Sequence, residues 1–340
     1  MKNPPDIAIV GATHLIGETL VQLLHEQNFP LGSLHLLDTG ESVGELVAFG
    51  EERLRVQDAE TFDFSGVQLT FTAGDPQIAR RLGEAAVEAG SRVVDASGAW
   101  AEDPDVALVI PEINPHELDA IRYRGIVASP DCHTVLLWLV LAPLRERFGF
   151  RQLFVTACNA VSREGKPGIE ELARQTTDLL NVRPIQPEHF GQQIAFNILA
   201  RTADILPGGH SADELRLVEE TRRLLPHAGL DMMVTVAQIP VFFGDVLQVY
   251  GVLEVPVDVD SLRAVVAETT GIEYLEADGE KGEPTPVTDA AGSDRVYLTR
   301  LRLAPERGDI FGAWIVGDCT RKGSALNCVQ IAEILVKDYL

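Results

Sequence analysis

The sequence predicts a soluble, two-domain α/β protein. Three observations carry this prediction. Short apolar runs alternate with helical patterns over roughly the first 130 residues, and the segments that follow are rich in β-branched residues. The chain of 340 residues is also long enough for two domains of ordinary size. Hydrophobic residues make up 46% of the chain and charged residues 23%, which is typical of a protein with well-packed cores.

The first part of the chain is expected to alternate strands and helices. Ile7–Val10 is a short apolar run that ends at Gly11, and a helix follows over Gly17–His25. The helix at Gln77–Ala89 is the clearest one, because its apolar residues are spaced to bury a single face. This alternation predicts a parallel sheet covered on both faces. Further strands are expected at Leu34–Leu37, Val67–Thr72, Arg92–Asp95 and Ala107–Ile110.

The second part of the chain is expected to form a mixed or antiparallel sheet with helices packed on it. Thr134–Phe148 is apolar on almost every side, which predicts a buried helix. Ala212–Leu225 is expected to be another helix, and the last helix begins near Ser324. The acidic segment Leu275–Arg295 is rich in Gly and Pro and predicts a surface loop. The expected strands are Leu153–Val161, Met233–Phe243, Val246–Val255 and Val296–Leu303.

Charge and cysteine usage exclude several classes of function. Lys and Arg total 28 against 51 Asp and Glu, and a formal charge of −23 repels phosphate backbones and anionic lipid head groups. We therefore expect neither nucleic acid nor a membrane as a partner. No apolar run reaches the ~18 residues of a membrane span and no signal peptide is recognisable, so the cytoplasm is expected. The cysteines are too few and scattered for a disulfide framework and lack CxxC spacing, so no metal is expected. They are Cys132, Cys158, Cys319 and Cys328.

The junction after the first strand has the pattern of a dinucleotide-binding loop. Its glycines permit a tight turn, and the free N–H groups of the next helix can hold a pyrophosphate. The imidazole of His14 would crowd the phosphate, so a tight turn without ligand is the alternative. Asp38 ends the second strand, where an acid often bonds a ribose 2′-hydroxyl and favours NAD; the alternative is a solvated charge. The loop residues expected to bind the cofactor are Gly11, Thr13, His14, Ile16 and Gly17.

Cys132 stands just before the first turn of the expected buried helix. A helix N-terminus lowers the pKa of a thiol and favours the nucleophilic thiolate. The neighbouring Asp131 opposes this effect. A small core residue is the alternative interpretation of Cys132.

Together these motifs resemble the aspartate-semialdehyde dehydrogenase family over nearly the whole chain. The resemblance implies a Rossmann-like nucleotide-binding domain over residues 1–130, completed by the C-terminal helix 324–340. It also implies a catalytic and dimerisation domain over residues 131–323, and hence a homodimer. The segments that carry it are Ile9–Thr13, Asp95–Ser97, Val109–Asn114, Ser129–Cys132, Ala160–Ser162, Ala195–Asn197, Ile239–Val241, Val329–Glu333 and, most specifically, Arg321–Asn327.

The resemblance also implies a chemistry, which belongs to amino-acid biosynthesis. In the family a Cys attacks the aldehyde, a His acts as base, hydride passes to NADP and phosphate resolves the thioester. Cys132 falls on the position of that nucleophile. Two positions on the substrate side keep their chemical type, with Asp213 in place of Glu and Arg216 in place of Lys.

Other positions depart from the family. The catalytic His is replaced by Asp245, and the Arg that grips the substrate carboxylate by Gln238. An Asp of ordinary pKa is a poor base near neutrality, and without the Arg a carboxylate has no bidentate partner. We expect that His133 cannot easily substitute, because successive helical residues project about 100° apart. The remaining changes are Asn159 for Gln at the reacting centre, Ala101 for a phosphate-binding Arg, Asp131 for Asn, His133 for a small hydroxyl residue, Cys319 for the Asn facing the nicotinamide, and Glu41 for an Arg near the NADP 2′-phosphate.

The sequence is most similar to the Usg-type homologues of that family, and three interpretations stay open. The first is a relative that has lost the ordinary reaction while keeping the fold and a site for a small molecule or for NAD or NADP. The second is an oxidoreductase that acts on another aldehyde or acyl phosphate through Cys132. The third is a regulatory or assembly protein that acts as a dimer. The combined substitutions favour the first.

Overall fold

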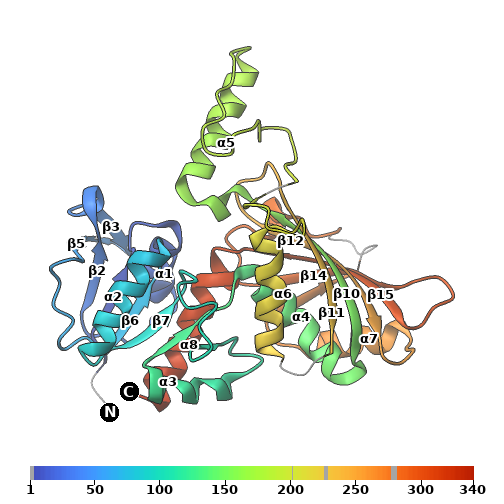
Figure 1. Cartoon of the computed structure of the whole chain (residues 1–340), viewed down its shortest axis with the longest axis horizontal. Coiled ribbons are helices and arrows are strands. Elements are labelled where there is room, and N and C mark those ends of the chain that lie inside the picture. Colours follow the sequence, from blue (N-terminus) through green and yellow to red (C-terminus); the bar gives the residue numbers. More distant parts are fainter. Residues whose placement is uncertain (1–3, 201, 226–228, 277–281) are drawn as a thin grey trace. The chain divides into compact units, whose positions relative to one another are not determined.

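We describe a computed structural model that covers residues 4–200, 202–225, 229–276 and 282–340. The chain divides into two compact units (Figure 1). Unit 1 comprises residues 1–130 and 324–340, and unit 2 comprises residues 131–323. Within the described residues, no helix is long and apolar enough to cross a membrane.

Unit 1 is built on a seven-stranded sheet in which every pair of neighbours is parallel, in the order β5-β2-β1-β6-β7-β9-β8. The predicted parallel sheet is confirmed. Its strands are β1 (Ile7–Val10), β2 (Leu34–Asp38), β5 (Gln57–Asp58), β6 (Leu69–Thr72), β7 (Arg92–Asp95), β8 (Ala107–Leu108) and β9 (Ile126–Ala128), beside a separate hairpin of β3 (Leu46–Phe49) and β4 (Glu52–Arg55). Its helices are α1 (Leu15–Glu26), α2 (Pro76–Glu88), α3 (Ile121–Arg124), α8 (Leu326–Asp338) and the short η1 (Gly40–Ser42) and η2 (Pro115–Ala120).

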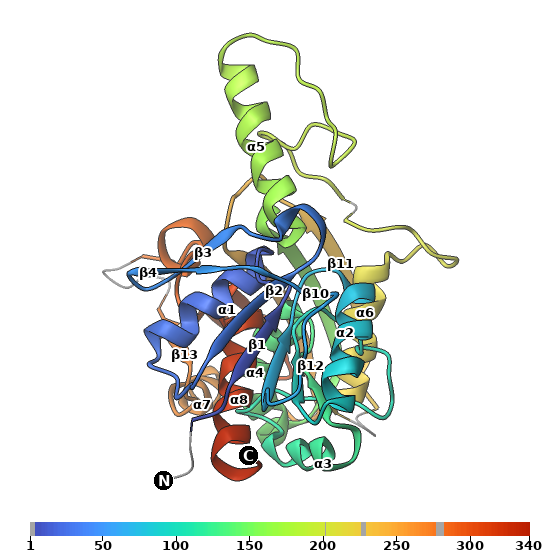
Figure 2. The same cartoon turned by 90° about the vertical axis from the view of Figure 1, so that its left-hand side faces the viewer.

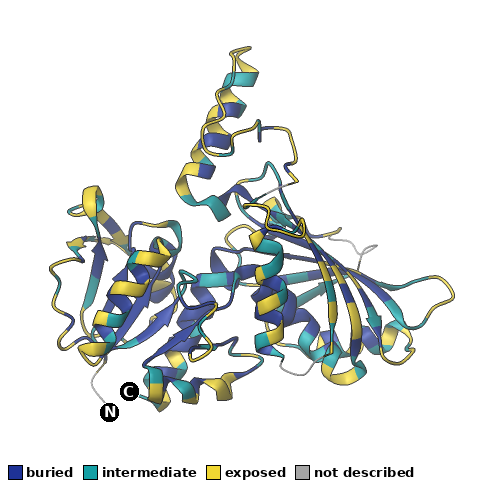
Figure 3. Cartoon of the chain, viewed as in Figure 1, coloured by how far each residue is buried: buried dark blue, intermediate teal, exposed yellow. Residues whose placement is uncertain are grey.

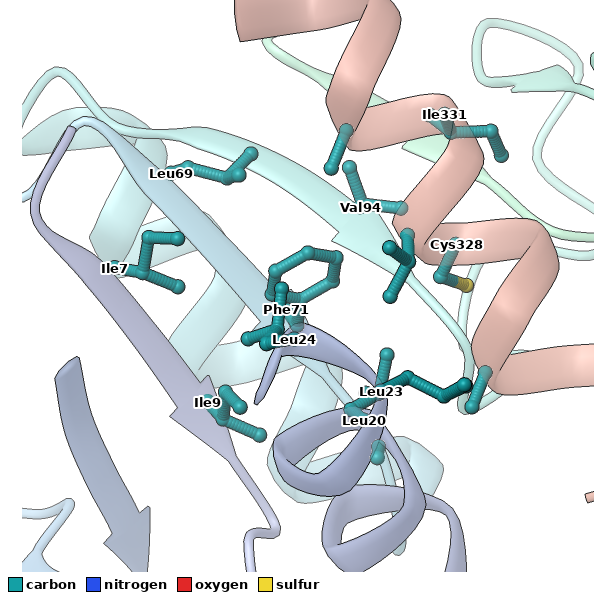
Figure 4. Packing of buried hydrophobic residues seen from close by; sticks show 14 of the residues in the cluster. Ile7, Ile9, Leu20, Leu23, Leu24, Leu69, Phe71, Val94, Cys328 and Ile331 are labelled. Atoms are coloured by element: carbon teal, nitrogen blue, oxygen red, sulfur yellow. The ribbon is translucent and has the colours of Figure 1, made fainter. Parts of the chain in front are cut away.

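The core of unit 1 joins both ends of the chain. Figure 4 shows Ile9 of β1, Leu23 of α1, Phe71 of β6 and Ile331 of α8 in one buried apolar cluster. Such packing removes large apolar side chains from water, which is the main force that holds the helices on the sheet. Buried Asn327 of α8 adds directional hydrogen bonds to this packing. Its amide donates to the carbonyl of Val109 and to the hydroxyl of Ser129, both at 2.9 Å.

Strand β1 lies between β2 and β6, so the strand order reverses at β1. Strands β2 and β5 lie on one side of it, and β6, β7, β9 and β8 lie on the other. In an open parallel sheet this reversal of strand order leaves a crevice at the carboxyl ends of the strands, where ligands bind. The Gly11–Gly17 segment begins at the carboxyl end of β1, and Asp38 ends β2. The topology therefore puts both predicted nucleotide-binding features at the usual place.

Unit 2 contains a mixed six-stranded sheet in the order β11-β10-β12-β15-β14-β13, as the sequence predicts. The pairs β10/β11 and β13/β14 are parallel and the others antiparallel. The strands are β10 (Phe150–Asn159), β11 (Asp231–Gln238), β12 (Asp245–Leu253), β13 (Ile272–Leu275), β14 (Val296–Leu303) and β15 (Ile310–Gly317). The helices are α4 (Cys132–Phe148), α5 (Gly165–Leu180), α6 (Ala212–Leu224), α7 (Val259–Ala267) and the short η3 (Val161–Glu164), η4 (Pro286–Ala290) and η5 (Arg321–Ala325).

Two boundaries in unit 2 differ from the prediction. The strand expected at Met233–Phe243 ends at Gln238, because Pro240 has no N–H to continue a ladder and Gly244 turns the chain with a φ of +88°. The segment Leu275–Arg295, expected to be a loop, contains the helical turn η4. Residues 277–281 of that segment lie outside the described ones.

The sheet of unit 2 has one covered and one open face. Leu153, Leu247 and Ile315 are fully buried on the face that packs on α4. The opposite face exposes large side chains, and Figure 3 shows exposed residues along its strands. These side chains are Phe154 of β10, Met233 of β11, Tyr250 of β12 and Trp314 of β15.

Helix α5 and the chain that follows it form an arm. Figure 2 shows α5 projecting beyond the end of the unit 2 sheet. Its buried Leu172 packs in a small cluster of its own with Val161, Ile194, Ala195 and Leu199. This separate cluster stabilises the arm without a contribution from the main core.

Candidate functional site

The Gly11–Gly17 loop of unit 1 depends on both of its glycines. Gly11 has a φ of +78°, and a Cβ on it would overlap the carbonyl of Ala73. A Cβ on Gly17 would overlap the carbonyl of Gly11. His14 is exposed at the N-cap of α1, with its imidazole against Gly74. The loop thus has the close backbone packing that a dinucleotide fold needs at the start of α1.

Asp38 is tied to this loop. One carboxylate oxygen accepts from the backbone N–H of Thr13 at 3.1 Å and from its hydroxyl at 2.7 Å, and the other accepts from the N–H of Thr39 at 2.9 Å. Asp38 is buried, so the alternative of a solvated strand-end charge is wrong. The carboxylate fixes the loop against the end of β2 and leaves a negative charge there.

The other predicted residues of unit 1 take varied positions. Glu41 is exposed on η1, and Ile16 is half-buried in the first turn of α1. Ala101 is buried beyond β7, where its methyl group offers no charge to a phosphate.

In unit 2, Cys132 is the first residue of α4 and Asp131 caps the helix. The Asp131 carboxylate accepts from the N–H of His133 at 3.0 Å. The sulfur of Cys132 is bonded to that of Cys319, 187 residues away and just beyond β15, with a Cα–Cα distance of 5.2 Å. The expectation that scattered cysteines would not pair is therefore wrong for these two. Spacing along the chain does not reveal that the fold brings the start of α4 against the end of β15.

Arg163 of η3 puts a positive charge beside Cys132. Sequence reasoning did not single this residue out. Its Nη1 donates to the Cys132 sulfur at 2.7 Å, and its Nη2 donates to Asp131 at 2.9 Å. Burial lowers the pKa of Arg163, but Asp131 and Asp245 raise it more, so the guanidinium stays charged. Burial likewise raises the pKa of Asp131, but Arg163, His133 and Arg216 hold it well below its usual range.

His133 lies beside the disulfide. One of its ring nitrogens and the two sulfurs of Cys132 and Cys319 all lie within 4.8 Å of one another. Its Nε2 is 3.6 Å from Oδ1 of Asp245, which is too long for a hydrogen bond. The same carboxylate oxygen accepts from the N–H of Ala160 at 3.0 Å. The His133 imidazole thus lies near the sulfur even though successive helical residues project about 100° apart. The expectation that it cannot easily substitute for the family's His stays a prediction.

Cys132, His133 and Cys319 are also the one group of His, Cys, Asp and Glu in the described part of the chain that brings three metal-ligating atoms together. The two sulfurs are bonded to each other, and a guanidinium already contacts one of them. A second cation would be repelled by Arg163 at this distance. We therefore assign no metal to this cluster.

The substrate-side positions make separate contacts. Gln238 at the end of β11 is buried, and its amide donates to the carbonyl of Asn159 at 2.9 Å. On α6, Asp213 accepts from the hydroxyl of Thr202 at 2.7 Å, and Arg216 lies 4.0 Å from Asp131. Both residues of α6 act on the charges beside Cys132, since Arg216 lowers the pKa of Asp131 and Asp213 raises that of Arg163.

Two models of known domains match the chain. A model of the semialdehyde dehydrogenase NAD binding domain matches residues 6–121, and one of the semialdehyde dehydrogenase dimerisation domain matches residues 141–322. The chain belongs to the semialdehyde dehydrogenase family.

Relatives and solved structures agree over the full length. The chain is 43% identical to a USG-1 protein homolog of Azotobacter vinelandii, covering 99% of each chain. It is 35% identical to aspartate-semialdehyde dehydrogenase 2 of Vibrio cholerae, covering all of both. The crystal structure of aspartate semialdehyde dehydrogenase II from Vibrio cholerae superimposes with a TM-score of 0.95, covering 99% of this chain and 100% of that one at 35% identity. A probable aspartate-semialdehyde dehydrogenase from Pseudomonas aeruginosa gives 0.94 at 43% identity, with the same coverage.

A buried acid on α6 makes the stability of unit 2 depend on pH. Glu220 accepts from the N–H of Asp131 at 2.8 Å and from the hydroxyl of Thr134 at 2.6 Å. Burial, followed by the charge of Asp131, raises the pKa of Glu220 from 4.5 to about 7. The folded state thus holds a proton that the unfolded chain releases, so this contribution to stability is full below pH 4.5 and is lost as the pH rises through about 7.

We predict that Glu220→Gln removes this loss, because the amide oxygen can accept the same two hydrogen bonds without a charge. Denaturant midpoints measured from pH 4.5 to 8 should fall for the parent and stay flatter for the variant. Glu219→Gln, at the exposed neighbour on the same helix, is the matched control and should follow the parent. Identical slopes for the parent and Glu220→Gln would contradict the assignment.

Proposed function

We propose that this chain is a USG-type member of the family that does not carry out the ordinary aspartate-semialdehyde dehydrogenase reaction. The observation that carries the proposal is the state of Gln238. It stands at the position of the family Arg that binds the substrate carboxylate. Its side chain is 1% exposed, and its amide N–H donates to the carbonyl of Asn159. A neutral amide offers no bidentate charged bond to a carboxylate.

The guanidinium nearest to Cys132 does not replace that Arg. Arg163 donates to both Asp131 and the Cys132 sulfur, so its charge is already matched inside the cluster. Asp245 adds a further negative charge where an acidic substrate would approach. Loss of a charged clamp alone costs roughly 10²-fold or more in rate.

The missing family His, in contrast, does not support the proposal by itself. His133 and Asp245 face each other at 3.6 Å, so an imidazole still lies near Cys132 although it comes from α4 instead of β12. A carboxylate beside an imidazole orients it and stabilises its charged form. The site therefore lacks a charged side chain for the substrate carboxylate at position 238, whereas an imidazole remains near Cys132.

This arrangement favours a second candidate function, an oxidoreductase acting on an aldehyde or acyl compound without an anionic head. Once the disulfide is reduced, the Cys132 thiolate would add to the carbonyl carbon and His133 would carry the proton to the carbonyl oxygen. Arg163 supports the thiolate through its contact with the sulfur. A nicotinamide cofactor, when bound, supplies the hydride acceptor; Gly11, Thr13 and Gly17 would hold it in unit 1.

We predict that the parent protein, fully reduced, turns over aspartate semialdehyde with phosphate at least 100-fold more slowly than the roughly 10 per second of an ordinary enzyme. Reduced-nucleotide formation measures it. Gln238→Arg combined with Asp245→His and His133→Ser restores the family's clamp and base and should raise the rate. Ordinary turnover by the parent would overturn the proposal.

Turnover of an uncharged aldehyde that disappears in Cys132→Ser and falls about 10²-fold in His133→Ala would support the second candidate.

We further propose that NAD binds better than NADP, because the Asp38 carboxylate and the exposed Glu41 put negative charge near the expected ribose. Calorimetry with both nucleotides should give tighter binding of NAD. Asp38→Asn keeps an acceptor for Thr13 and should reduce the preference by roughly 5-fold, since one charge near a 2′-phosphate is worth about 1 kcal/mol in a wet site. Glu52→Gln on the β3–β4 hairpin is the control. Tighter NADP binding by the parent would show that these acids are not at the ribose.

The open face of the unit 2 sheet supports a homodimer. Phe154, Tyr250 and Trp314 expose apolar area on adjacent strands, and a domain of the dimerisation family carries them. Exposed patches of this kind mark interfaces, and a two-fold axis lets one patch cover its own copy. A role as a dimeric regulatory or assembly protein would use the same interface without catalysis.

We predict that light scattering at micromolar concentration gives twice the 37.0 kDa mass of one chain. Tyr250→Glu should shift the particle toward a single chain, because a charge would be buried at the centre of the face. Tyr123→Glu, at a residue that is 92% exposed in unit 1, is the matched control and should stay dimeric. A single-chain mass for the parent would contradict the prediction.

A further inference from the structure

The four cysteines have different environments. Cys132 and Cys319 are joined to each other, whereas Cys158 and Cys328 are free thiols. Burial and the charge of Asp245 raise the pKa of Cys158, and burial in the apolar core of unit 1 raises that of Cys328. Thiols of raised pKa are poor nucleophiles at neutral pH, so these two are chemically quiet.

Cys132 differs because cationic and dipolar groups meet at its sulfur. The Arg163 guanidinium lies 2.7 Å from it, and the residue opens a helix of 17 residues whose N-terminal N–H groups favour a negative charge. The facing acids are Asp131 and Asp245. Asp131 is paired with Arg163 at 2.9 Å, which offsets its charge, and Asp245 lies 3.6 Å from the imidazole of His133.

Within the described part of the chain, no guanidinium is seen to donate to the sulfur of Cys319 as Arg163 does to that of Cys132. It follows Asp318, whose carboxylate accepts from the backbone and the hydroxyl of Thr320. The two sulfurs of the disulfide are therefore unequal as leaving groups. Cleavage that releases Cys132 gives a thiolate next to a guanidinium, and this is the better leaving group.

We propose that Cys132 and Cys319 form a redox-active dithiol–disulfide couple that exchanges with low-molecular-weight dithiols and disulfides, with Cys132 as the thiolate member. This proposal does not depend on which reaction, if any, the site catalyses. It assigns a use to Cys319, at a position where the family has Asn, and to Arg163.

The exchange balances as a two-electron transfer. A thiolate of a small dithiol attacks the Cys319 sulfur, the S–S bond breaks, and its electron pair stays on Cys132. The second sulfur of the reductant then attacks its own partner in the mixed disulfide, so the reductant leaves as a cyclic disulfide and Cys319 leaves as a thiolate that takes up a proton. Oxidation by a small disulfide runs the other way, beginning with attack by Cys132.

The redox state of the couple determines whether Cys132, which stands at the position of the family's nucleophile, has a free thiol. In the oxidised form Cys132 has no thiolate, so any chemistry at this site requires prior reduction. Cys132 and Cys319 are 5% and 4% exposed, which admits a small thiol more readily than a protein partner. The site would therefore respond to the pool of small thiols.

The first test counts thiols in a Cys158→Ser, Cys328→Ser background, which leaves only the couple. The chain is denatured in N-ethylmaleimide before and after dithiothreitol treatment, and its mass is measured. We expect no added maleimide before reduction and two after it, with complete return when the dithiothreitol is removed and oxidised glutathione is supplied. Cys319→Ser in the same background should take up one maleimide before and after dithiothreitol treatment. Two free thiols in protein kept with oxidised glutathione would overturn the proposal.

The second test separates redox chemistry from a purely structural crosslink. The couple is equilibrated in mixtures of reduced and oxidised dithiothreitol. Arg163→Gln should shift the equilibrium about 10-fold toward the disulfide, because the Cys132 thiolate loses a charge-assisted hydrogen bond. Arg163→Lys should restore most of the shift, and Arg174→Gln on α5 is the control. In Cys319→Ser, the iodoacetamide rate against pH should show a Cys132 pKa below 8.5 that rises in Arg163→Gln. An unchanged equilibrium and an unchanged pH profile in Arg163→Gln would overturn the assigned role of Arg163.

Discussion

The partly buried ion pair between Asp131 and Arg163 is the interaction on which the start of α4 depends. Asp131 caps the helix through the N–H of His133, while Arg163 binds Asp131 and the Cys132 sulfur together. A buried pair stabilises little in total, but removal of one partner leaves an uncompensated charge and is costly. The position of η3, the direction of Cys132 and the proximity of His133 to Asp245 are therefore coupled, and a change at one of them affects the others.

The same cluster changes how the replaced family residues are understood. Taken singly, Asp245 in place of His is the loss of a base. In the fold, Asp245 faces His133, which itself stands where the family has a small hydroxyl residue, so the two changes are complementary and an imidazole remains within the cluster. Gln238 shows no such compensation in its contacts, since its amide is used by Asn159. Gln238 is therefore the position whose contacts give the proposed loss of the ordinary reaction its clearest support.

In unit 1 the equivalent constraint is the bond between Asp38 and Thr13. It joins the end of β2 to the glycine loop after β1, so the loop is held in shape before any ligand arrives. Preorganisation of this kind lowers the cost of binding a dinucleotide. The proposed contact of Asp38 with a ribose would thus use the same carboxylate that holds the loop in shape.

The sequence alone determined the parallel sheet of unit 1, the mixed sheet of unit 2, the buried α4 and the family, because apolar periodicity, glycine positions and ordered motifs are local properties of the chain. It also indicated Cys132, Asp38, Gln238 and Asp245 as site residues, and their roles stay predictions. It could not predict the bond between Cys132 and Cys319, the contact of Arg163 with the sulfur, or the approach of His133 to Asp245. These contacts form where η3 and the start of α4 meet β12 and the end of β15. The side chains that meet there come from segments up to 187 residues apart. Only the tertiary structure decides such meetings, since no spacing along the chain encodes which helix end closes on which strand end.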